Sequence, residues 1–126
     1  MTLTRAAADP PQAVDPRILD ALVARLGDRG PSFRTSLIQT WRDEAAGRLA
    51  DLAAAATAGD AAGVARVAHA FKSSSASLGA GPLTLTCDEV ETRLRAGGAG
   101  DLTADAAAIT QAVERTGAAF AELWAP

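Results

Sequence analysis

Hydrophobic residues recur at three- and four-residue steps along most of this chain, which is the spacing of one face of an α-helix. The longest such pattern predicts a helix from about Gly30 to Thr57. Charged residues in this segment fall mostly between the apolar positions and predict a solvated face. The expected core positions of this helix are Phe33, Leu37, Ile38, Trp41, Ala45, Leu49, Leu52 and Ala56.

Capping residues and glycines delimit four more helices. A short one is expected over 15–27, and longer ones over 60–79, from 81 to the glycine-rich break at 97–100, and over 101–124. Aspartates precede three of them, and Pro16 stands at the first position of the helix over 15–27, where its missing N–H costs nothing. Their expected core positions are Ile18, Leu19, Leu22, Val23, Leu26, Val64, Val67, Ala68, Phe71, Leu78, Leu83, Cys87, Val90, Leu94, Leu102, Ile109, Val113, Thr116, Phe120 and Leu123.

Four long amphipathic helices joined by short links predict an all-α fold, an antiparallel four-helix bundle with an additional short N-terminal helix. The 32 alanines support this prediction, because alanine is the best helix former and lets helices approach closely. At 126 residues the chain is expected to form one domain. We predict a bundle over 15–126, preceded by a disordered segment over 1–14 that contains Pro10-Pro11.

Composition excludes several kinds of function. The net charge of −3 and scattered basic residues argue against nucleic-acid binding. No apolar run is long enough to span a bilayer, and the first residues lack the apolar core of a signal peptide. The single cysteine, Cys87, excludes an internal disulfide and suits a reducing compartment, where it is expected to be a small buried apolar residue. We therefore predict a soluble cytoplasmic protein.

The usual signatures of enzymes and cofactor sites are missing from the sequence. One His and one Cys on different predicted helices do not make a metal site, and no Glu-x-x-His pair is present for a di-iron centre. No phosphate-binding glycine loop occurs, so the chain has no visible means of using ATP. The serines at 73–75 share a helix with the histidine and are interpreted as small spacers, not as a catalytic nucleophile. No cofactor and no enzymatic activity are expected.

His69 and Lys72 are the candidates for chemistry. They are the only histidine and the only lysine, and the other eleven basic residues are arginine. At about 100° per residue, His69 points about 150° away from the core-facing direction of its helix. Lys72 and Ser73 are its neighbours on the helix surface, and the small Ser73 leaves the ring uncovered. An ordinary surface or core histidine is the alternative, because lone histidines have many such roles.

The run His69-x-x-Lys72-Ser73-Ser74-Ser75-x-x-Leu78-Gly79-Ala80 resembles the signature of histidine-containing phosphotransfer (HPt) domains. The similarity continues through Leu83, Cys87 and Glu91, in the pattern L-x-x-x-C-x-x-L-E, with Val90 in place of the second Leu. The resemblance is close over residues 60–95, and in the other helices only the pattern of apolar and polar positions is similar. The family commonly has Gly where this chain has Ser73, which is still small enough to leave the histidine accessible.

The resemblance implies that His69 accepts a phosphoryl group, that Lys72 stabilises its charge and that Ser73 gives access. The chain would be a stoichiometric carrier between receiver-domain aspartates of a hybrid histidine kinase and of a response regulator, with Mg²⁺ held by the receiver. A neutral, exposed imidazole is a competent nucleophile, and phosphoryl transfer needs mainly alignment and nearby cations. The outward face of the helix predicts the docking surface, which comprises Ala62, Ala65, Arg66, Ser73, Ala76 and Ser77.

Two alternatives remain open from the sequence. A helical-bundle adaptor that binds partner helices would use the same fold without phosphorylation. A phosphotransfer module of a chemotaxis-type kinase would carry the same motif. The initial Met and the lack of a kinase domain favour a free-standing phosphotransfer protein, which we expect to be a monomer because a complete bundle needs no second chain.

Overall fold

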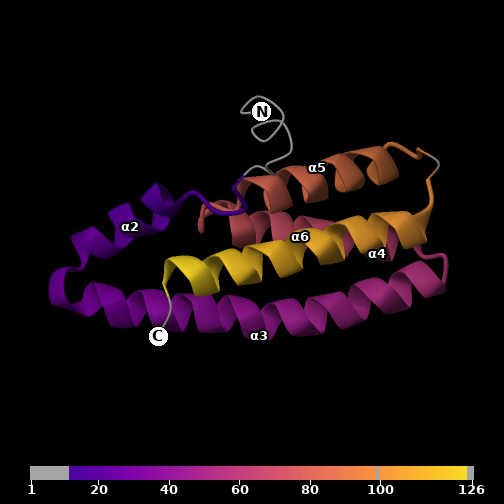
Figure 1. Cartoon of the computed structure of the whole chain (residues 1–126). Helices are drawn as coiled ribbons and strands as arrows, with labels where there is room; N and C mark the ends of the chain where they lie inside the picture. Colours follow the sequence, from indigo (N-terminus) through magenta and orange to yellow (C-terminus); the bar gives the residue numbers. More distant parts are fainter. Residues whose placement is uncertain (1–11, 99, 125–126) are drawn as a thin grey trace, which may run out of the picture.

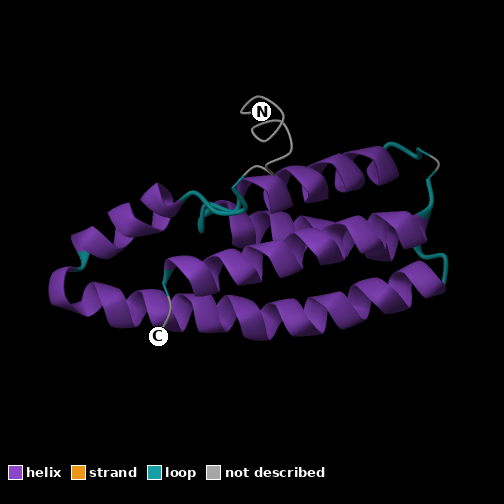
Figure 2. Ribbon diagram, in the orientation of Figure 1, coloured by secondary structure: helices purple, strands orange, loops and turns teal. Residues whose placement is uncertain are grey.

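A computed structural model describes residues 12–98 and 100–124 of the chain. Its elements are α2 (Pro16–Arg25), the short 3-10 helix η1 (Gly27–Arg29), α3 (Gly30–Thr57), α4 (Ala61–Ala76), α5 (Gly81–Arg95) and α6 (Leu102–Leu123). The described residues form helices and loops without a strand (Figure 2). None of these helices is both long and apolar enough to cross a membrane. The predicted all-α class is confirmed.

The four long helices form an antiparallel bundle. Helices α3 and α5 run in one direction, and α4 and α6 run in the other (Figure 1). Helix α2 lies beside the first part of α3 and extends beyond the end of the bundle (Figure 1). This is the predicted four-helix bundle with an additional short N-terminal helix. The arrangement places α4 between α3 and α5, with which it makes its most extensive contacts.

Aspartate caps set the starts of three helices, as the sequence predicted. The Asp15 carboxylate accepts a hydrogen bond from the Arg17 backbone at 3.0 Å. Asp60 accepts one from the Gly63 backbone at 2.9 Å. Asp101 caps α6 in the same way. Each carboxylate satisfies a backbone N–H that has no partner within its helix.

The turn after α4 requires glycine and is also hydrogen-bonded to the segment that precedes α2. Gly79 has a φ of +79°, which glycine adopts without strain, and a Cβ there would lie 2.6 Å from the Asp15 carbonyl oxygen. The Asp15 backbone N–H donates to the Gly79 carbonyl at 2.9 Å. Just before it, Val14 is only 1% exposed and belongs to the core. The prediction of a disordered segment over 1–14 is therefore wrong at Val14, and its first eleven residues lie outside the described part of the chain.

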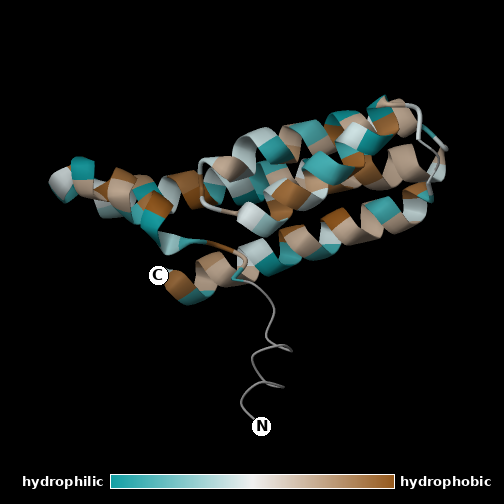
Figure 3. Cartoon of the chain, turned by 90° about the horizontal axis from the view of Figure 1, so that it is seen from above, coloured by the Kyte–Doolittle hydropathy of each residue, from teal (hydrophilic) through white to brown (hydrophobic). Residues whose placement is uncertain are grey.

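The core runs the length of the bundle between the helices. Trp41 and Phe120 join α3 to α6 in an edge-to-face pair with ring centroids 5.2 Å apart. Cys87 is fully buried, as predicted, and burial raises the pKa of its thiol to about 12. Hydrophobic and hydrophilic residues are interspersed along the helices that Figure 3 shows. The prediction is confirmed for most core positions, and the fully or nearly buried ones are Leu19, Val23, Ile38, Trp41, Ala45, Leu52, Val64, Ala68, Phe71, Leu78, Leu83, Cys87, Val90, Ile109, Val113, Thr116 and Phe120.

Three predicted core residues are substantially exposed: Ile18 (47%), Phe33 (41%) and Leu123 (38%). They lie in α2, in the first turns of α3 and in the last turn of α6. These segments are at the end of the bundle, where a helix has fewer neighbours to cover its apolar stripe (Figure 1). Periodicity identifies the apolar side of a helix but not how far the neighbouring helices reach along it.

Gly47, in the middle of α3, offers a test of helix stability. It is exposed, and a Cβ at this position would meet no atom within 4 Å. We expect Gly47→Ala to raise the free energy of unfolding by about 0.5–1 kcal/mol, because alanine loses less backbone entropy in a helix. Urea denaturation measures the change. Gly63→Ala is the contrasting variant, since its Cβ would fall 2.4 Å from the Asp60 carboxylate; equal stability changes for the two variants would contradict this account.

Candidate functional site

His69 lies on the outer side of α4, and its side chain is 57% exposed. The predicted outward orientation is therefore confirmed. One edge of the ring faces the neighbouring helix α5, where Nδ1 lies 3.0 Å from Oε2 of Glu91. The ring is thus open to a partner and yet fixed by a polar contact on one side.

Glu91 is the centre of a charged cluster. Its side chain is only 9% exposed although it carries a carboxylate. Lys72 Nζ lies 2.8 Å from Oε1, and Arg95 Nε donates to Oε2 at 2.8 Å. These cations, Lys72 first, hold the pKa of Glu91 at about 2, well below its ordinary value, against the opposing effect of burial. The carboxylate is therefore ionised at neutral pH.

The ionised Glu91 determines which nitrogen of His69 carries the proton. A carboxylate can only accept hydrogen bonds, so Nδ1 must be the protonated nitrogen that donates to it. In the neutral ring this leaves the lone pair on Nε2. The contact therefore holds the ring in one tautomer and one orientation, with the nucleophilic nitrogen directed away from Glu91.

Lys72 contacts two carboxylates on α5. Its Nζ lies 3.1 Å from Asp88 Oδ1 in addition to its contact with Glu91, and its side chain is 29% exposed. Hydrogen bonds to Glu91 and then Asp88 raise the pKa of Lys72, so it is a cation throughout the neutral range. The sequence placed this ammonium beside His69 as a movable group. The structure adds that α5 holds it in place.

Sequence reasoning assigned no role to Asp88, Glu91 or Arg95. Glu91 is part of the motif that resembles the HPt signature, and the three residues are spaced at steps of three and four, on one side of a helix. That spacing signals a charged stripe, but it does not say which helix the stripe faces. Only the pairing of α4 with α5 brings it against His69.

The predicted docking surface is exposed at all but one of its positions. Ala65 is buried at 2% exposure, so its assignment to this surface is wrong. Ala65 lies one turn before His69 on α4, which packs between α3 and α5, and its short methyl group does not reach beyond the packing of the helices. The exposed members are Ala62, Arg66, Ser73, Ala76 and Ser77.

The three serines after Lys72 differ in their surroundings. Ser73 is exposed on the side of α4 that carries His69. Ser74 Oγ accepts a hydrogen bond from Arg48 of α3 at 3.2 Å. Ser75 is fully buried and accepts one from the indole N–H of Trp41 at 3.4 Å. Two of the predicted spacers therefore also bind α4 to α3.

No cluster of three or more potential metal ligands is present among residues 12–98 and 100–124. The acidic residues around His69 are paired with Lys72 and Arg95. An exposed imidazole next to a fixed carboxylate and a cation can act as a nucleophile.

Comparison with known proteins identifies the family of this chain. The sequence model of the Hpt domain matches residues 36–119, which include all of α4 and α5. The chain therefore belongs to the Hpt family and is a histidine phosphotransfer domain protein of the phosphorelay type.

Among solved structures, the chain is similar to histidine-containing phosphotransfer protein B from Pseudomonas aeruginosa PAO1. The TM-score is 0.71 and the sequence identity 26%, over 90% of this chain and 96% of that one. No curated protein matches the chain. The similarity extends over the whole bundle and is not confined to the motif around His69.

Proposed function

We propose that this protein carries a phosphoryl group between aspartates of receiver domains through a phosphohistidine at His69. The observation that supports this best is the exposed ring whose Nδ1 is held by the ionised Glu91. Such a ring presents Nε2, with its lone pair, to a partner. The protein acts as a stoichiometric carrier and not as an enzyme, since the receiver supplies both the phosphoryl group and the Mg²⁺.

In the proposed step, the Nε2 lone pair of His69 attacks phosphorus and forms the P–N bond. The P–O bond to the receiver's aspartate breaks, and its electron pair leaves with that carboxylate. The Nδ1 proton stays on the ring, which now carries positive charge next to the Glu91 carboxylate. The reverse step returns the phosphoryl group to an aspartate of a second receiver. Glu91 thus stabilises the charge that the ring acquires in the intermediate.

The partners are receiver domains of a hybrid histidine kinase and of a response regulator. They would approach the exposed positions of the predicted docking surface, where most side chains are small and allow close contact. Arg66 is the charged member, 3.8 Å from Asp60 and available to a partner because its side chain is 68% exposed. A monomer in the cytoplasm is the form in which we propose that the relay operates.

The defining experiment is incubation of the protein with a phosphorylated receiver domain and Mg²⁺. We expect transfer of label to this chain with the stability of a phosphoramidate, labile in acid and stable in base. A helical adaptor without phosphotransfer would bind partners and take no label. Failure to acquire label from several receiver domains would therefore favour the adaptor and contradict the proposal.

Lys72→Ala is expected to slow phosphoryl transfer while the fold stays intact. The phosphoryl oxygens carry negative charge in the transition state, and an ammonium next to His69 can stabilise it. Loss of one such cation is expected to reduce the rate roughly ten-fold or more. Single-turnover transfer from a labelled receiver measures the rate, and circular dichroism checks the fold. An unaltered rate would remove the proposed role of Lys72.

A further inference from the structure

We propose that Asp88 is a positioning residue that competes with the phosphoryl group for Lys72 and so lowers the phosphorylated fraction of His69 at equilibrium. This inference rests on the proposed function and names a residue that sets the equilibrium position of phosphoryl transfer. Before the phosphoryl group arrives, the Lys72 ammonium already contacts two carboxylates on α5. The same ammonium is expected to stabilise the phosphoryl group.

The two carboxylates that hold Lys72 differ in their exposure to solvent and in their other contacts. Glu91 is 9% exposed and also contacts His69 and Arg95, so it is fixed from three sides. Asp88 is 52% exposed, and Lys72 is the cation with which it pairs within the described part of the chain. If one contact of Lys72 must break, that with Asp88 breaks more easily, because water can replace the ammonium around an exposed carboxylate.

A phosphoryl group on His69 places new acceptor oxygens near the same ammonium. Lys72 has three N–H donors, and in the resting site Glu91 and Asp88 are within 3.1 Å of its nitrogen. The phosphoryl oxygens must share this charge with both carboxylates or displace one of them. They are also repelled by the negative charge of Asp88 itself. Both effects favour the unphosphorylated protein, so removing the Asp88 charge should shift the equilibrium toward phosphohistidine.

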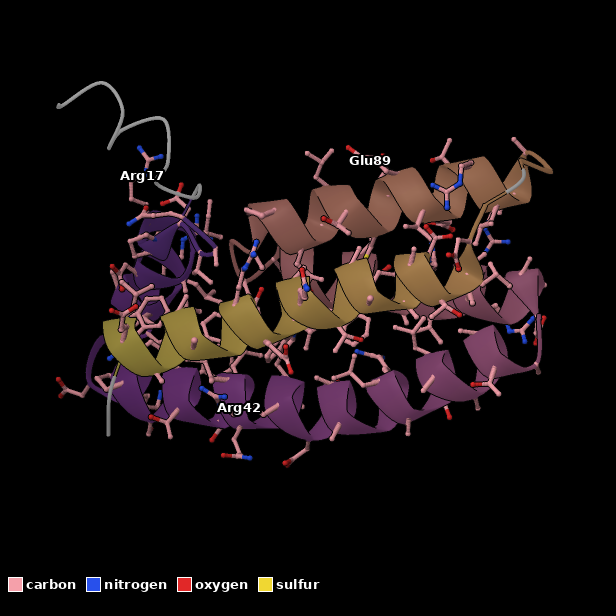
Figure 4. All side chains as sticks on the ribbon, turned by 45° about the vertical axis from the view of Figure 1, so that its right-hand side comes forward. Arg17, Arg42 and Glu89 are labelled. Carbon is pink, nitrogen blue, oxygen red and sulfur yellow. The ribbon has the colours of Figure 1, made fainter. Side chains whose placement is uncertain are left out.

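The chain offers a matched control on the same helix. Glu89 is exposed and lies on the outer side of α5, away from the other helices (Figure 4). Asp88→Asn and Glu89→Gln each convert one carboxylate of adjacent residues into an amide of similar size. Both variants change the net charge equally, but only Asp88→Asn removes a partner of Lys72.

The experiment measures the equilibrium between a phosphorylated receiver domain and each variant of this protein, by separating the two labelled species. We expect Asp88→Asn to raise the equilibrium constant for phosphorylation of His69 roughly two- to five-fold, the range expected of one partly exposed ion pair. Glu89→Gln should leave it unchanged. In a Lys72→Met background, Asp88→Asn should have a smaller effect, because only the direct repulsion between Asp88 and the phosphoryl group then remains.

Several results would overturn the inference. They are an unchanged or lowered equilibrium constant for Asp88→Asn, an equal rise for Glu89→Gln, and a rise of the same size without Lys72. The last two results would mean that the loss of one negative charge, and not the release of Lys72, raises the equilibrium constant. Asp88→Ser repeats the test if the amide alters folding. If the wild-type protein takes no label, the proposed function itself fails; if it takes label and the variants do not differ, only this inference fails.

Discussion

Replacing His69 by Gln is expected to abolish phosphoryl transfer from a receiver domain to this protein. The chain contains no second histidine that could accept the group. The glutamine amide nitrogen is not a nucleophile, because its lone pair is delocalised into the carbonyl. Since the His69 side chain is 57% exposed and a glutamine amide can also donate a hydrogen bond to the Glu91 carboxylate, the variant should fold as the wild type does.

The measurement is the amount of label that each protein acquires from the same phosphorylated receiver. Glu89→Gln serves as the control, because it introduces the same residue type at an exposed position away from the site (Figure 4). Label that persists in His69→Gln would rule out His69 as the acceptor. Acid-stable label in that variant would indicate a serine, and Ser73 is the exposed serine closest to His69 in the sequence.

Much of the fold follows from local features of the sequence. The bounds of α3 were predicted as Gly30 to Thr57 and are confirmed, because Pro31 and the glycines near both ends interrupt an otherwise continuous apolar pattern. The aspartate caps were recognised for the same reason: a cap acts within three residues of its own position. The exposed Phe33 shows the limit, since its environment depends on which other helices extend that far.

The site was only partly predictable. His69 and Lys72 were identified because each is unique in the chain, and the outward orientation of His69 follows from the helical period. Its contact with Glu91 depends on how α4 and α5 are aligned along each other, which periodicity does not determine. The burial of Ala65 has the same cause. Properties of a single helix were thus available from sequence, and properties shared by two helices were not.

Glu91→Gln is expected to slow phosphorylation of His69 roughly ten-fold or more, the effect typical of a carboxylate that orients a reactive histidine. The glutamine amide can either accept a hydrogen bond from Nδ1 or donate one to it, so the ring is no longer restricted to the tautomer with its lone pair on Nε2. The amide also loses the negative charge that balances the phosphorylated ring. Single-turnover transfer measures the rate, and ¹⁵N NMR of the His69 ring measures the tautomer.

The control is Glu89→Gln, which makes the same chemical change on α5 away from His69 (Figure 4). A slower rate with an unchanged tautomer would assign Glu91 a purely electrostatic role. An unchanged rate would contradict its role altogether, and with it the argument that a fixed Nδ1 proton prepares Nε2 for attack.

The same variant tests the ionisation of Glu91 through stability. Its pKa is lowered from 4.5 to about 2, chiefly by Lys72, so the carboxylate stabilises the fold above the unfolded value of 4.5, and this contribution is lost as the pH falls toward 2. The stability of the wild type should therefore decrease more steeply than that of Glu91→Gln over this range, as measured by denaturation at successive pH values. Parallel curves would mean that Lys72 and Arg95 do not lower the pKa of Glu91. A wild type that instead gained stability relative to Glu91→Gln as the pH fell would mean that burial raises the pKa of Glu91. The fixed tautomer of His69 would then lose its physical basis, because a protonated Glu91 could donate to Nδ1 and leave the lone pair on the wrong nitrogen.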